Sequence, residues 1–505
     1  ILMPITSLPS PYGVGTLGQC ARDFIQFLHR AGQTYWQILP ICPTGYGDSP
    51  YQSFSSYAGN PYMIDFDDLK EEGLLQEEEY TSLSWGDQPT TVDYGLLYGH
   101  KFTVLKTACS RISGALSEQF QKFCKEQKFW LDDYALYMSI KDYHGGQSWK
   151  EWPETLQKRE KDSLEAIHQE LTDEILFWKK VQFLFFYQWD RLKAYAEENN
   201  IKIIGDLPIY VSYDSADVWA HPEEFQLDEN LCPIEVAGCP PDGFSADGQL
   251  WGNPLYCWEK MRKDGYRWWM ERIAGAARLY DVLRIDHFRG LESYWSVPFG
   301  ETTASRGHWV KGPGMDFIDA VRARFPTLPI IAEDLGYLSP EVHALLKASG
   351  FPGMKVLEFA FDASGESSYL PHRYPKNCVV YTGTHDNMTL QGWYRSLEPD
   401  AKAFAIRYLG NPYTPEGEIH WDYIRLALAS VAKLAVIPVQ DYLGLGDWAR
   451  TNEPSTLGKN WRWRMKKDDL TPELLAKCRE MAETYGRVKK EKSGPLKETE
   501  QLQKA

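Results

Sequence analysis

Acidic side chains stand at the ends of several apolar runs of the sequence. Asp286 ends the run 281–286, Glu333 follows the run 329–332, and Asp386 lies shortly after the run 378–382. Two carboxyls in one dry pocket cannot both ionise freely, so one keeps its proton while the other stays charged. An acid and a nucleophile produced in this way can split a glycosidic bond. Arg284, two positions before Asp286, favours the charged form of that carboxyl.

A structural role is the alternative for each of these acids. Carboxylates at strand ends often cap the next helix or pair with a neighbouring base, and Asp334 is open to that interpretation. The aromatic content matters when the acids are taken together. With 19 Trp, 30 Tyr and 22 Phe, the chain is rich in rings that stack on the apolar faces of sugars. The combination favours carbohydrate chemistry.

Other function classes find little support in the sequence. The motif Gly-x-Gly-x-x-Gly at 13–18 follows a segment with two prolines instead of a strand, which argues against a nucleotide site. The nine Cys are scattered without a Cys-x-x-Cys pair, so we expect no metal, no other cofactor and a reducing, cytoplasmic compartment. The net charge of −16 disfavours nucleic acid as a partner. The apolar stretch 424–439 contains two basic residues and falls short of a membrane span.

The elements that must position the acids alternate along the chain. The β-rich runs are 35–40, 201–206, 281–286, 329–334, 355–360, 378–382 and 434–438, and the candidate helices are 21–30, 174–199, 265–280, 316–325 and 423–433. Alternation of helices with fully buried strands is typical of α/β proteins with a parallel sheet. A large open sheet and a closed barrel both fit this order. Acids at the ends of several strands favour a (β/α)8 TIM-type barrel with inserted subdomains, because barrel enzymes build their sites there.

The domain organisation follows from the segments that interrupt this alternation. We expect one catalytic barrel domain over 1–505, with a mainly helical insertion at 62–172. The segment 212–262 is rich in Asp, Pro and Gly, so it is predicted to be a loop-rich insertion over the active site. The last residues, 487–505, are rich in Lys and Glu and are predicted to form a solvated tail.

Seven short motifs carry a resemblance to a known family. They lie at 44–53, 205–210, 240–245, 249–254, 284–289, 332–336 and 383–386. Together they make the chain resemble the 4-α-glucanotransferases, called amylomaltase in bacteria and disproportionating enzyme in plants, from residue 4 to residue 463. The resemblance implies a retaining double displacement on α-1,4-glucans such as maltooligosaccharides, starch or glycogen.

The resemblance also implies roles for individual residues. Asp286 is expected to be the nucleophile, Glu333 the general acid and base, and Asp386 the acid that binds hydroxyls of the distorted sugar. The expected substrate-binding residues are Ser49, Tyr51, Asp206, Asp242, Gln249, Trp251, Arg284, His385 and Asn460. A second glucan groove is expected near Tyr46 and Tyr94.

Several alternatives stay open at this point. The same barrel could serve an α-1,4-glucan hydrolase, and a non-catalytic glucan-binding protein would keep the aromatic residues. Gln249 and Asn460 also suit hydrogen bonding within a loop. The pair Trp268 and Trp269 suits core packing because it lies in a predicted helix, and the pair at 461 and 463 can mislead in the same way. A plastid is the alternative location if a transit peptide has been removed.

Overall fold

Short parallel strands form the centre of the structure. The computed structural model describes residues 1–45, 47–241, 246–336, 338–362 and 364–488. Four strands form one sheet in the order β1-β2-β5-β8, and three form another in the order β11-β10-β9. Their bounds are β1 Tyr35–Gln37, β2 Lys202–Leu207, β5 Val282–Ile285, β8 Ile330–Ala332, β9 Gly353–Val356, β10 Cys378–Tyr381 and β11 Leu434–Val436. All pairings within the two sheets are parallel, which suits strands covered on both faces.

One seam between these sheets is closed by the second residue of the chain. Leu2 pairs in parallel with Gln37 on one side and with Pro438 on the other. In the described part of the chain, eight parallel segments including Leu2 therefore complete the (β/α)8 TIM-type barrel that the sequence predicts. The eighth segment was not predicted because its apolar run, residues 1–3, is short and ends at Pro4.

The other seam, between β8 and β9, uses a side chain. The Ala332 N–H donates to the Pro352 carbonyl at 3.0 Å, and the Met354 N–H donates to Oδ1 of Asp334 at 2.6 Å. The Asp334 carboxylate thus takes the place of a main-chain acceptor, which is the structural role left open for it. The predicted run 355–360 extends too far, because β9 ends at Val356 and a 3-10 helix, η6 (Leu357–Phe359), follows.

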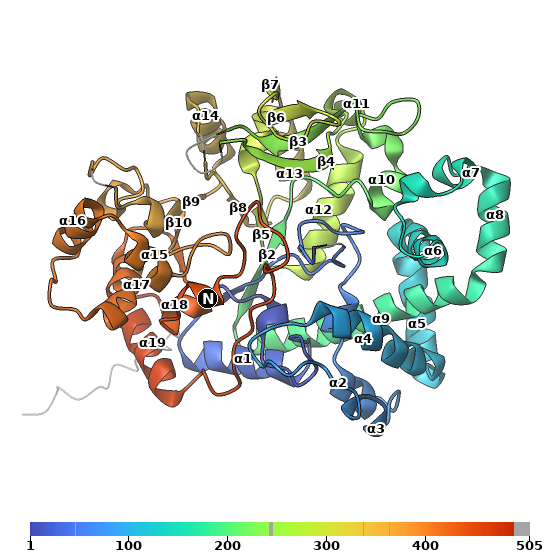
Figure 1. Ribbon diagram of the computed structural model, residues 1–505, viewed down its shortest axis with the longest axis horizontal. Coiled ribbons are helices and arrows are strands. Elements are labelled where there is room, and N and C mark those ends of the chain that lie inside the picture. The colour runs from blue at the N-terminus through green and yellow to red at the C-terminus, as the bar shows by residue number, and fades with distance from the viewer. Residues whose placement is uncertain (46, 242–245, 337, 363, 489–505) are drawn as a thin grey trace, which may run out of the picture.

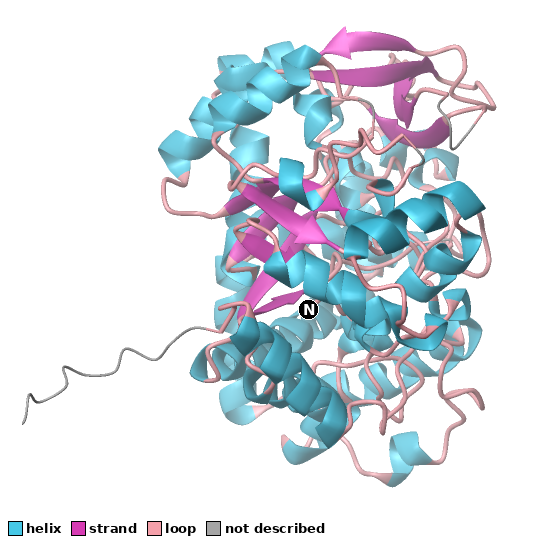
Figure 2. Cartoon of the chain, turned by 90° about the vertical axis from the view of Figure 1, so that its left-hand side faces the viewer, coloured by secondary structure: helices cyan, strands magenta, loops and turns pink. Residues whose placement is uncertain are grey.

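Helices surround the barrel (Figures 1 and 2). Those corresponding to predicted helices are α1 Gln19–Arg30, α9 Thr172–Glu198, α12 Arg267–Leu279, α13 Gly314–Arg324 and α17 Ile419–Ala429. The others after α9 are α10 Ala216–Ala220, α11 Trp258–Lys263, α14 Pro340–Ser349, α15 Leu390–Ser396, α16 Pro399–Leu409, α18 Val439–Tyr442 and α19 Pro472–Thr484. Helix α17 ends four residues before the predicted position 433. Arg487 donates to the carbonyls of Leu428, Ser430 and Ala432 at its end.

The contacts of Arg487 also correct the expected start of the solvated tail. Arg487 is anchored to the end of α17 instead of extending into solvent. Its own backbone N–H donates to the Ala482 carbonyl in α19 at 2.7 Å. The rest of the predicted tail, apart from Val488, lies outside the described residues.

The segment 62–172 consists of helices and loops, and no strand is assigned within it. Its α-helices are α2 Phe66–Glu71, α3 Glu78–Thr81, α4 Tyr94–Ser110, α5 Gly114–Glu126, α6 Lys128–Tyr143, α7 Glu154–Gln157 and α8 Lys161–Glu170. They pack beside the long helix α9, on the right of the barrel in Figure 1.

The segment 212–262 is more ordered than its composition predicts. It contains α10, α11 and the strands β3 (Glu235–Cys239) and β4 (Gln249–Pro254). These strands form an antiparallel sheet, in the order β4-β3-β6-β7, with β6 (Ser293–Pro298) and β7 (His308–Lys311). Figure 1 shows this sheet above the barrel. The two strands β3 and β4 were not predicted, because β3 pairs with a strand that comes about 55 residues later and local composition carries no signal for such pairing.

Most of the large aromatic side chains belong to the core. Six tryptophans are almost fully buried: Trp36, Trp149, Trp152, Trp189, Trp219 and Trp269. Trp268 is also buried, so the tryptophan pair in α12 serves packing. The nine cysteines are free thiols. Within the described ranges, none of the helices has the length and apolar character needed to cross a membrane.

Candidate active site

A guanidinium joins two carboxylates at the barrel mouth. Asp206 on β2 lies directly opposite Arg284 on the neighbouring strand β5. Nη1 of Arg284 donates to both oxygens of Asp206 at 2.7 Å and to Oδ1 of Asp286 at 2.9 Å. Burial raises the pKa of Asp286 well above its ordinary value, and Arg284 acts in the opposite direction. The ion pair thus lowers the free-energy cost of keeping a charged carboxylate in this pocket.

Glu333 comes from the strand next to β5. Its backbone N–H donates to the Ile285 carbonyl at 3.0 Å, which places it beside Asp286. The backbone N–H groups of His287 and Leu335 each donate to one of its carboxyl oxygens at 2.7 Å. Burial raises the pKa of Glu333, whereas Arg284 and these two donors oppose the rise. In the described structure, no cation lies within ion-pair distance of Glu333, whereas Arg284 contacts Asp286 directly.

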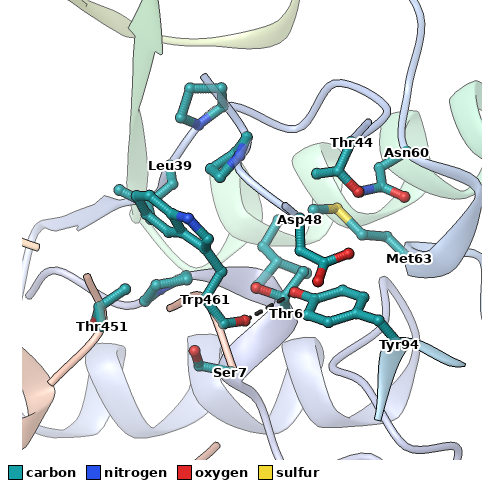
Figure 3. A pocket seen from close by; sticks show the side chains of 14 residues that line it. Thr6, Ser7, Leu39, Thr44, Asp48, Asn60, Met63, Tyr94, Thr451 and Trp461 are labelled. Carbon is teal, nitrogen blue, oxygen red and sulfur yellow. Dashed lines mark hydrogen bonds between the residues drawn. The ribbon is translucent and has the colours of Figure 1, made fainter. Parts of the chain in front are cut away.

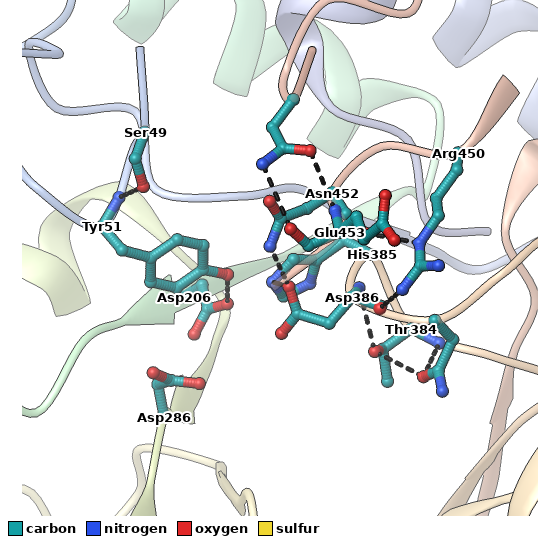
Figure 4. Close-up of polar contacts among 12 residues, drawn as sticks. Ser49, Tyr51, Asp206, Asp286, Thr384, His385, Asp386, Arg450, Asn452 and Glu453 are labelled. Atoms are coloured by element: carbon teal, nitrogen blue, oxygen red, sulfur yellow. Dashed lines mark hydrogen bonds and ion pairs between the residues drawn. The ribbon is translucent and has the colours of Figure 1, made fainter. Parts of the chain in front are cut away.

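Asp386 lies on the segment that follows β10. Its Oδ1 accepts a hydrogen bond from Asn452 at 2.6 Å, and its backbone carbonyl accepts one from Arg450 at 2.7 Å. The Asp386 side chain is 46% exposed, so its other oxygen remains accessible at the mouth of the barrel. Figure 4 shows Asp386 facing Asp206 and Asp286 across the site. The site therefore combines carboxyls from four strands.

Aromatic rings form one wall of this site. Tyr51 stacks on His385 with ring centroids 5.2 Å apart and an angle of 11° between the planes. The Tyr51 hydroxyl donates to Asp206 at 2.7 Å, and the Ser49 hydroxyl accepts the Tyr51 N–H at 3.3 Å. Trp461 contacts both rings, at 5.8 Å from Tyr51 and 5.9 Å from His385. Burial lowers the pKa of His385, which favours a neutral imidazole that can donate and accept hydrogen bonds.

The strand β4 forms another wall. The Trp251 ring packs edge-on against His287 with centroids 4.8 Å apart. Its Nε1 donates to Gln249 Oε1 at 3.2 Å. His287, whose backbone N–H binds Glu333, is in the left-handed region with φ of 52°. Trp251 thus packs against the residue that follows Asp286, and Gln249 is bonded to Trp251.

The four other residues predicted for the site are Asp242, Tyr46, Asn460 and Tyr94. Asp242 and Tyr46 lie outside the described residues. The amide of Asn460 bonds to backbone groups of Glu453 and Thr456, which favours the loop-stabilising interpretation over a direct sugar contact. Tyr94, at the start of α4, lines a pocket with Asp48 and the backbone of Trp461 (Figure 3). Its hydroxyl donates to the Trp461 carbonyl at 2.8 Å.

Sequence analysis missed several residues that shape the site. Trp461 was treated as a misleading aromatic, yet its ring lies against Tyr51 and His385. Its position within the range of the family resemblance, 4–463, was the available signal. Arg450 and Asn452 hold the Asp386 segment from a loop after β11, and their separations of 64 and 66 residues from Asp386 left no pattern to detect.

Carboxyls at the ends of barrel strands, flanked by aromatic rings, define this chain as a carbohydrate-active barrel enzyme. The family model described as 4-alpha-glucanotransferase matches residues 3–471. The chain belongs to the 4-α-glucanotransferase family, and the resemblance inferred from its motifs is confirmed.

Individual relatives cover nearly the whole chain. The 4-alpha-glucanotransferase of Thermus thermophilus is 50% identical over 97% of this chain and 98% of the relative. That of Clostridium butyricum is 47% identical over 96% of this chain and 100% of the relative. The solved structure of amylomaltase from Streptococcus agalactiae in complex with acarbose superposes with a TM-score of 0.94. It is 41% identical, covering 97% of this chain and 99% of that one. The protein is thus an enzyme of the glucan-transferring class, and the alternative of a non-catalytic glucan-binding protein is rejected.

Proposed function

We propose that the enzyme transfers α-1,4-glucan segments by a double displacement in which Asp286 is the nucleophile. Asp286 attacks the anomeric carbon of the donor, and the bond from that carbon to the leaving glucan's O4 breaks. Glu333 gives its proton to that oxygen. The 4-hydroxyl of an acceptor then attacks the glucosyl ester, returns its proton to Glu333 and releases Asp286.

The observation that carries this proposal is the pairing of Asp286 and Glu333 at the ends of adjacent strands. Of these two carboxyls, only Asp286 forms an ion pair with Arg284 in the described structure. Asp286 is therefore in direct contact with a cation, whereas Glu333 is held in place by backbone N–H donors. This difference in surroundings separates nucleophile from acid, as the two steps require.

The walls of the site support roles in sugar binding. Tyr51, His385 and Trp461 offer ring faces and hydrogen-bonding groups around the cleaved sugar, and Asp386 has an oxygen free to accept from sugar hydroxyls. Trp251 and Gln249 are placed for the acceptor side. Positioning a sugar hydroxyl here while excluding water favours transfer over hydrolysis.

The pocket at Tyr94 supports a second glucan groove. Trp461 lines this pocket and accepts a hydrogen bond from Tyr94 with its carbonyl, and its ring also contacts Tyr51 and His385. A glucan bound there would lie next to a residue of the active site. We also propose a cytoplasmic location, supported by nine free thiols.

Incubation with maltotriose tests the activity. Transfer produces glucose together with a ladder of longer maltodextrins, whereas shortening products alone would indicate a hydrolase. The variants Asp286→Ala and Glu333→Gln should each lose the ladder. Unchanged turnover in either would refute the assigned roles.

A further inference from the structure

One buried carboxyl near the mouth has no role in the proposed chemistry. Glu358 lies on η6, directly after β9, and is 8% exposed. Its backbone N–H donates to the Thr382 carbonyl at 3.2 Å, just past the end of β10. Thr382 begins the segment 382–390, which leads to α15 and carries His385 and Asp386.

The Glu358 carboxyl packs against the backbone of this segment. Its Oε1 lies 2.6 Å from where a Cβ on Gly383 would stand, so a larger residue there would collide with the carboxyl. Gly383 is three residues before Asp386. Oε1 is buried and has no hydrogen-bond partner among the described residues. A buried oxygen without a donor is a costly place for negative charge.

The groups facing Glu358 include a second acid. Asp441 on α18 accepts hydrogen bonds from the Thr382 hydroxyl at 2.5 Å and from the Leu390 N–H at 2.8 Å, so it holds both ends of the segment. Burial raises the pKa of Glu358 well above its ordinary value. The carboxylates of Asp441 and Asp447 add to this rise, whereas Arg450 and the Asn387 amide oppose it.

We propose that Glu358 is a positioning residue that works as a neutral carboxylic acid. It fills the space behind Gly383 and supports the segment that Arg450 and Asn452 also bind, and it thereby fixes Asp386 at the barrel mouth (Figure 4). The inference rests on the proposed role of Asp386 in sugar binding. Ionisation of Glu358 would place a second charge beside Asp441 and loosen the segment.

Kinetics of two variants test the role. Glu358→Gln keeps the shape and neutrality of the acid, so its kcat on maltotriose at neutral pH should stay within about threefold of the parent value. Glu358→Ala leaves a cavity behind Gly383 and should lower kcat at least about tenfold with a smaller change in KM. The exposed Glu366→Gln is the matched control for a lost carboxylate. An equal loss of kcat in Glu358→Gln and Glu358→Ala would overturn the proposal.

Thermal unfolding tests the protonation state even where the alanine variant fails to fold. The pKa of Glu358 is raised in the folded enzyme, so its contribution to stability is complete below about pH 4.5 and is lost as the pH rises toward the folded value. Glu358→Gln lacks this loss, and its Tm relative to the parent should increase between pH 5 and pH 9. A constant Tm difference would overturn the proposal. An active Asp386→Asn variant would instead refute the role of Asp386.

Discussion

Arg284 donates from Nη1 to Oδ1 of Asp286 at 2.9 Å. The contact arises from strand geometry, because residues two apart on a strand project to the same side. Arg284 is 3% exposed, and the same nitrogen binds Asp206 on the next strand. The cation is therefore fixed between two carboxylates before a substrate arrives, and the charge of the nucleophile depends on it.

Replacing Arg284 should disable the nucleophile. Arg284→Leu leaves two buried carboxylates without their cation, and we expect kcat/KM on maltotriose to fall at least about 100-fold. The pKa of Asp286 should rise further, so the acid limb of the pH profile should move to higher pH. Arg284→Lys should lower kcat/KM less and should move the acid limb by a smaller amount. An acid limb that stays in place in both variants would contradict the dependence of Asp286 on this ion pair.

The barrel seam at Asp334 provides a stability prediction. A Cβ on Gly353 would lie 2.7 Å from both carboxylate oxygens of Asp334. Gly353→Ala should therefore lower the free energy of unfolding by about 1–3 kcal/mol, measured by denaturant titration. In the double variant with Asp334→Ala, the effect of the added methyl should shrink. Additive losses in this double-mutant cycle would show that the two residues do not compete for the same space.

Trp461 should contribute to binding the cleaved sugar. Trp461→Ala removes the ring that contacts Tyr51 and His385, and KM for maltotriose should rise about 5–10-fold. Trp461→Phe should recover part of the loss. Tyr413→Ala, at a ring that is 89% exposed, is the matched surface control. A Trp461→Ala enzyme with parental KM would remove this residue from the sugar-binding wall.

The barrel could be predicted because its strands are local apolar runs. Seven strands correspond to continuous apolar runs of the sequence, and the acids at the ends of these runs indicated which end of the barrel carries the site. Leu2, which closes the barrel as a single bridging residue between Gln37 and Pro438, lies in an apolar run of only three residues and was not recognised. The antiparallel sheet also escaped prediction, because β3 depends on β6, a partner far along the chain.

Residue types revealed the acids more readily than the groups that tune them. A carboxylate after a buried strand is conspicuous in a sequence, whereas the backbone N–H of His287 that binds Glu333 is invisible there. His287 also adopts a left-handed φ, a conformation for which the sequence carries no specific signal at a non-glycine residue. Likewise, the amide of Asn460 could be assigned to its loop only once Glu453 and Thr456 were placed around it.

Direct capture of the glucosyl ester tests the central claim, that Asp286 is the nucleophile. Glu333→Gln, which cannot activate the acceptor, should be incubated with an α-maltosyl fluoride, whose leaving group departs without a proton from the enzyme. Peptide mass spectrometry should then find a maltosyl group esterified to Asp286, and Asp286→Asn in the same background should show none. A sugar attached to any other carboxylate, or to none while fluoride is released, would contradict the account.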